Sequence, residues 1–213
     1  MRYALAFVLV PAVILNAAAG ARAATQLTAT LTNAAETGTP VVPTLVNLQP
    51  RPVSFGTANF TLNDAQTALT MSVEVHNIDF TGSQTADTND NLTNAHIHAS
   101  ATVTPSTNAG VVWGFIGTPF NDNNPQDVVV TPFIGDVGGT VTAKWDAAEG
   151  QGTTLTLQLA NILSGHSYIN FHTNQFGGGE IRGNIAVVPE PASLTVLATG
   201  ALGLLARRRT RRA

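Results

Sequence analysis

The 213-residue sequence contains no cysteine and few charged residues. Without cysteine no disulfide can stabilise the fold, so packing and hydrogen bonds must hold the chain together even in an oxidising compartment. Charged residues make up only 11% of the sequence, whereas Thr, Asn, Gly and Ala are common. Because this composition suits short strands and turns better than amphipathic helices, we expect an all-β fold.

The central segment, residues 24–188, has little positive charge. It contains three basic residues, Arg51, Lys144 and Arg182, against twelve acidic ones, which gives a net charge of about −9. Such a surface repels phosphate backbones and anionic headgroups and is compatible with cations. We therefore expect no nucleic-acid partner for this segment.

The sequence also lacks the motifs of common hydrolases and calcium sites. It has no G-x-S-x-G motif, and Ser164 and His166 lie too close in sequence to form a triad. The acidic, Asn-rich segment 79–94 lacks the spacing of a calcium loop and is interpreted as a polar loop. We expect no enzymatic activity.

Residues 1–23 have the pattern of a secretory signal peptide. Met1-Arg2 precedes an apolar run from Ala4 to Leu15, and the segment ends in Ala21-Arg22-Ala23. This run is too short to span a bilayer, so we expect a signal helix that signal peptidase removes after Ala23.

Residues 188–213 differ sharply from the segment before them. A proline-rich motif at 188–191 precedes an uncharged run at 192–206 and an arginine-rich tail at 207–213. This order predicts a spacer, a short transmembrane helix that anchors the precursor in the inner membrane, and a basic end that stays in the cytoplasm.

The motif Pro189-Glu190-Pro191 makes this segment resemble the PEP-CTERM sorting signal. The resemblance implies processing by an exosortase-type protease and release to the surface or extracellular matrix of a Gram-negative bacterium. An ordinary tail anchor would have the same hydropathy, and only the proline motif separates the two interpretations.

One domain, residues 24–187, remains between these ends. Alternating apolar residues predict strands at 26–31, 59–63, 68–76, from 96, 111–116, 128–134 and 140–145. Leu155, Leu157 and Leu159 continue at strand spacing, and residues 160–163 could close as one helical turn before Gly165. Trp113, Phe115 and Trp145 are expected in the core.

Residues 168–185 predict a β-hairpin. Ile169 and Phe171 alternate with polar residues, and Gly177, Gly178 and Gly179 supply the positive φ angles expected of the connecting loop. Pairing the two strands would place His172, Glu180 and Arg182 together on the polar side of the hairpin.

The blocks Tyr168–Thr173, Gly178–Gly183 and Ala95–His98 resemble the chordin-type CHRD domain. The resemblance covers about residues 24–187 and implies an extracellular antiparallel β-sandwich, of the Greek-key type found in immunoglobulin and superoxide dismutase domains. It implies no catalytic activity.

His96 and His98 are the best ligand-like pair in the chain. Residues i and i+2 of a strand share a face, so both imidazoles could bind one ion while Ile97 points into the core. By the same alternation His172 lies on the polar face of its predicted strand, and Glu180 could supply a carboxylate as a fourth ligand. Copper or zinc would suit these ligands. The alternatives are exposed histidines on a polar face, or histidines that only hydrogen-bond the hairpin.

Two functions therefore stay open. The first is a secreted, exosortase-sorted surface or matrix module that binds a partner and has no enzymatic activity. The alternative is a periplasmic or extracellular domain that binds copper or zinc through His96, His98 and His172.

Overall fold

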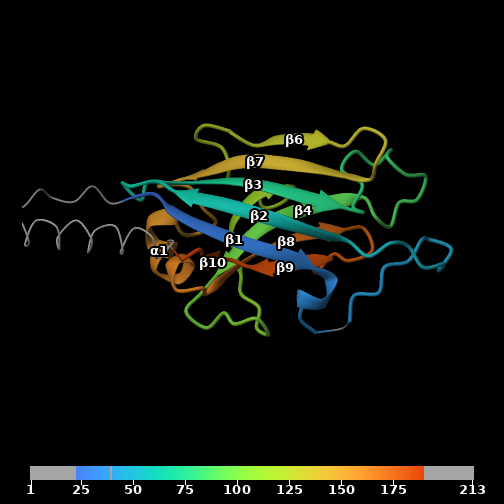
Figure 1. Cartoon of the computed structure of the whole chain (residues 1–213), viewed down its shortest axis with the longest axis horizontal. Coiled ribbons are helices and arrows are strands. Elements are labelled where there is room, and N and C mark those ends of the chain that lie inside the picture. Colours follow the sequence, from blue (N-terminus) through green and yellow to red (C-terminus); the bar gives the residue numbers. More distant parts are fainter. Residues whose placement is uncertain (1–22, 39, 190–213) are drawn as a thin grey trace, which may run out of the picture.

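A computed structural model describes residues 23–38 and 40–189 (Figure 1). Strands dominate this part of the chain, which confirms the predicted all-β class. The strands are β1 Thr25–Thr32, β2 Phe55–Leu62, β3 Ala68–His76, β4 Leu92–Ala99, β5 Val111–Ile116, β6 Val129–Pro132, β7 Gly138–Asp146, β8 Ser167–Thr173, β9 Ile181–Asn184 and β10 Ala186–Val187. A short 3₁₀ turn, Asn33–Ala35, follows β1, and the helix α1, Leu155–Leu163, precedes β8.

All ten strands belong to one antiparallel sheet. The strand order is β5-β4-β8-β9-β1-β2-β3-β7-β6, and β10 pairs with β1. Along β1, Leu27, Ala29 and Leu31 are buried and the residues between them are more exposed, as strand geometry requires of a sheet with one covered face. The strands form one continuous sheet. The β-sandwich of two separate sheets and the Greek-key connection therefore stay predictions.

The sheet is strongly curled (Figure 1), and residues from strands near its two ends meet in the core. Trp113 on β5 stacks on Trp145 on β7 with ring centroids 5.5 Å apart, although the two strands lie near opposite ends of the strand order. Phe115 packs edge-on against Phe171 of β8 at 5.8 Å. All four rings are fully buried, which confirms the predicted core position of Trp113, Phe115 and Trp145.

The prediction of a strand through Leu155, Leu157 and Leu159 is wrong, because these residues lie in α1. The Thr154 side chain accepts a hydrogen bond from the Leu157 amide at 3.3 Å and caps the helix. Leu155 and Ile162 are buried, and Leu159 and Leu163 pack against the core beside them. These positions follow the helical spacing of i, i+4, i+7 and i+8, which an alternation over five residues does not reveal.

Two strands begin a full four residues earlier than the sequence predicted. β2 starts at Phe55 and β4 at Leu92, four residues before the expected starts in each case. In β4 the extra residues pair with β8, so His96 lies in the middle of the strand rather than at its start.

Several predictions fall on residues that the structure does not describe. These are the signal helix, the membrane helix 192–206, the basic tail 207–213, and Glu190 and Pro191 of the sorting motif. Among the described residues, no helix combines the length and the apolar character that crossing a membrane requires.

The helix α1 offers a matched pair of leucines for a stability test. Leu155 has no exposed surface and Leu157 is 70% exposed. We expect Leu155→Ala to lower the free energy of unfolding by about 2–5 kcal/mol and Leu157→Ala to change it by less than about 0.5 kcal/mol. Urea unfolding measures both. Equal losses would instead support a strand, in which the two side chains share one face.

Candidate functional site

The predicted histidines lie on the outer face of β4 and β8. In the β4–β8 register, His96 is opposite Asn170 and His98 is opposite Tyr168. Ile97 and Phe171 alternate with these residues and are buried in the core on the other face. His96, His98 and His172 are only 4–7% exposed, because loops cover this outer face too. The structure therefore brings the three histidines together in a buried layer.

Each histidine ring is oriented by one backbone carbonyl. His96 Nε2 contacts Thr118 O at 3.2 Å, His98 Nδ1 contacts Ala109 O at 2.9 Å, and His172 Nδ1 contacts Gly177 O at 3.0 Å. A carbonyl oxygen can only accept a hydrogen bond, and none of these contacts is longer than the other contacts of the same ring, so we assign the ring proton to each of these nitrogens. In a neutral ring the other nitrogen is then an acceptor.

The three remaining ring nitrogens point toward one another. His96 Nδ1 lies 3.2 Å from His172 Nε2, and the ligand atoms of all three rings lie within 4.8 Å of one another. Asn170 Oδ1 lies 3.1 Å from both His98 Nε2 and His172 Nε2. Asn170 therefore belongs to the cluster. The sequence analysis missed it, although it shares a strand face with His172.

Burial keeps the three rings neutral. The pKa of His96 is lowered to about 4, mainly by burial and in addition by repulsion from the charged forms of His172 and His98. Burial also lowers the pKa of His98 and of His172. At neutral pH the cluster consequently presents unprotonated nitrogen atoms to its centre.

Aromatic and cationic side chains support the cluster from the side of β9. The Tyr168 ring stacks on His98 with centroids 4.5 Å apart, and the Arg182 guanidinium lies 3.6 Å from the Tyr168 ring centre. Arg182 also donates to Thr104 O, Thr107 O and Asn108 Oδ1 at 2.8–3.0 Å. Arg182 thereby fastens the loop before β5 that supplies the carbonyl partner of His98.

The hairpin loop between β8 and β9 differs from the prediction. Of its three glycines only Gly179 has a positive φ, 129°. A side chain at Gly179 would collide with the Glu36 carboxyl and approach the Asn170 amide nitrogen. This glycine therefore lets Glu36 lie beside Asn170.

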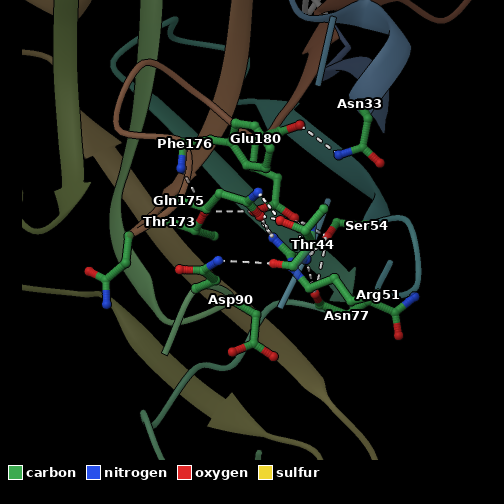
Figure 2. Close-up of polar contacts among 12 residues, drawn as sticks. Asn33, Thr44, Arg51, Ser54, Asn77, Asp90, Thr173, Gln175, Phe176 and Glu180 are labelled. Atoms are coloured by element: carbon green, nitrogen blue, oxygen red, sulfur yellow. Dashed lines mark hydrogen bonds and ion pairs between the residues drawn. The ribbon is translucent and has the colours of Figure 1, made fainter. Parts of the chain in front are cut away.

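Glu180 does not join the histidines, so its assignment as a fourth ligand is corrected. Its carboxylate is fully buried and forms an ion pair with Arg51, with Oε2 2.6 Å from Nη2 and Oε1 2.8 Å from Nη1 (Figure 2). Thr173 donates to the same carboxylate at 2.6 Å, and Ser54 Oγ also contacts it. Thr173 and His172 point to opposite faces of β8. Glu180 precedes β9, so strand alternation did not determine the direction of its side chain.

The Arg51–Glu180 ion pair can be compared with an exposed pair on β3. Replacing Glu180 by Ala leaves the Arg51 charge buried and unpaired, and we expect the free energy of unfolding to fall by about 3–5 kcal/mol. Glu74 lies 2.9 Å from His76 in a solvent-exposed pair, and Glu74→Ala should cost less than about 1 kcal/mol. Chemical denaturation of both variants tests this, and similar losses would contradict it.

The Glu36 carboxyl should make stability depend on pH. Its pKa is raised from 4.5 to about 7, because the effect of burial outweighs the lowering by the Arg182 charge and by the neighbouring Asn170 amide. The folded state then binds more protons than the unfolded state between pH 4.5 and 7, so this contribution to stability falls as pH rises through that window.

Glu36→Gln should remove this contribution. We expect the variant to gain stability relative to the parent chain as pH rises from 5 to 8, measured by thermal unfolding at each pH. A stability difference that stays constant with pH would contradict the assignment.

Comparison with known protein families gives two matches. Residues 27–185 match the CHRD domain, and residues 187–212 match the PEP-CTERM protein-sorting motif. Neither a curated protein nor a solved structure matches the chain. The sorting motif implies export, processing by an exosortase and sorting to the cell envelope. Because the CHRD match covers most of the sequence, the chain belongs to the CHRD domain family.

Proposed function

We propose that this chain is a non-enzymatic surface module of a Gram-negative bacterium. Signal peptidase removes residues 1–23, the C-terminal helix holds the precursor in the inner membrane, and an exosortase releases the domain to the cell surface or extracellular matrix. There the CHRD domain binds a partner. The observation that carries this proposal is that the sorting motif begins at residue 187, directly after the domain match ends at 185.

The arrangement of the two chain ends supports this processing. β1 and β10 pair, with Leu27 opposite Val187, and the Val188 amide donates to Gln26 O at 2.8 Å. Ala23 and Pro189 are both exposed. The described chain therefore begins and ends at the same end of the domain (Figure 1), where a protease would act next to exposed residues and away from the core.

The loop between β1 and β2 supports a binding role. It carries exposed apolar side chains, Val42, Val46, Leu48 and Val53, at the end of the molecule away from the two termini (Figure 1). Arg51 fixes this loop to the sheet through Glu180. A module attached at one end would thus present a fixed apolar loop at the other.

The surroundings of Ser164 and His166 support the absence of a hydrolase site there. Ser164 Oγ donates to Ala160 O at 2.6 Å, and His166 Nδ1 contacts Val103 O at 2.7 Å. Each side chain is hydrogen-bonded to a different backbone carbonyl, so this serine and histidine are not arranged as a nucleophile and its base.

Substitution of the sorting motif tests the proposal in a host that contains an exosortase. In the parent chain we expect a shortened domain in the surface or extracellular fraction. The double substitution Pro189→Ala and Glu190→Ala should leave a full-length precursor in the membrane fraction, as measured by mass and immunoblotting. Glu74→Ala, far from the motif, serves as the control and should be sorted like the parent. Release of the double variant at the parental rate, or a mature parent domain in the cytoplasm, would refute the proposal.

A further inference from the structure

We propose that His96, His98 and His172 bind one transition-metal ion that prefers imidazole nitrogen, Zn²⁺ or Cu²⁺, with Asn170 Oδ1 directed at the same point. The ligand atoms are His96 Nδ1, His98 Nε2 and His172 Nε2. This inference goes beyond the proposed sorting function and does not depend on it.

The first argument is that every atom at the centre of the cluster is an acceptor. The N–H groups of all three rings face outward to the carbonyls of Thr118, Ala109 and Gly177. The Asn170 amide nitrogen lies near the Glu36 carboxyl, which directs its oxygen toward the rings. Three lone pairs and one amide oxygen therefore converge without a hydrogen-bond donor among them.

The second argument is that this arrangement is unfavourable unless a cation occupies it. His96 Nδ1 and His172 Nε2 are 3.2 Å apart, and two unprotonated nitrogens at that distance repel each other. A purely structural cluster would place an N–H of one ring on the nitrogen of the next. Here the ring protons are already used by backbone carbonyls, so a metal ion is the group that makes the inner contacts favourable.

The third argument is that the outward hydrogen bonds match those of ligating histidines. Metal-binding imidazoles usually donate their second ring nitrogen to a carbonyl or carboxylate, which fixes the ring orientation. In this domain the three carbonyls come from three different loops. Gly114 permits one of these contacts, because a side chain there would overlap Pro119 O and come within 3.0 Å of His96 Cδ2.

The donor set also selects the class of ion. Three imidazole nitrogens and one neutral amide oxygen suit zinc and copper, whereas calcium and magnesium require mostly oxygen ligands. No thiolate can compete, because the chain has no cysteine. Within the described residues, the three histidines are the group with metal-binding geometry.

Metal binding by the full chain, purified in detergent and stripped with chelator, tests the inference. After dialysis against Zn²⁺ or Cu²⁺ salts, elemental analysis should find one ion per chain. His96→Ala and His172→Ala should each weaken binding by about 100-fold or more, since each removes a direct ligand. His166→Ala is the matched control, because His166 bonds Val103 O outside the cluster, and it should retain one ion.

If a variant fails to fold, the ligands of the metal ion in the parent chain still test the proposal. Paramagnetic resonance of the Cu²⁺-loaded parent should show hyperfine coupling to imidazole nitrogens. A parent chain that retains no ion, a Cu²⁺ spectrum without nitrogen coupling, or folded His96→Ala and His172→Ala variants that bind like the parent would overturn the proposal. Comparison of the Zn²⁺ and Cu²⁺ affinities identifies the preferred ion.

Discussion

The antiparallel pairing of β4 with β8 is the constraint on which the rest of the domain depends. Because strand residues alternate between faces, the same register puts Ile97 and Phe171 into the core and His96, His98, Asn170 and His172 on the outer face. A shift of one residue would exchange the two sets. The hydrophobic core therefore fixes the position of the polar cluster, and the cluster needs no separate scaffold.

Two buried polar groups take over part of the role that disulfides have in many exported domains. The histidine cluster joins segments 76 residues apart in sequence, and the Arg51–Glu180 pair joins segments 129 residues apart. Both fasten loops to the curled sheet, from opposite faces of β8. Removing one partner from either group lowers the free energy of unfolding. An unsatisfied buried polar atom costs about 1–3 kcal/mol, and an unpaired buried charge costs more.

The sequence predicted those features that depend on period-two alternation. The strand at 111–116 and the strand at 68–76 have the predicted bounds, and the shared face of His96 and His98 follows from the same rule. The same rule also puts Asn170 on the strand face of His172. For the helix α1 the sequence predicted only a turn at 160–163, since leucines at 155, 157 and 159 fit a strand, and the helical spacing becomes apparent only with the buried Ile162 and the partly buried Leu163. The direction of Glu180 depends on Arg51, a partner far away in sequence, and no local pattern encodes it.

The central claim is that three ring nitrogens face one another without protons, and the protonation of each ring nitrogen tests it most directly. Nitrogen-15 NMR of the metal-free domain at neutral pH distinguishes the two tautomers of each histidine. The account predicts the proton on Nε2 of His96 and on Nδ1 of His98 and His172, each directed to a backbone carbonyl. A proton on His96 Nδ1, or on Nε2 of His98 or His172, would contradict it.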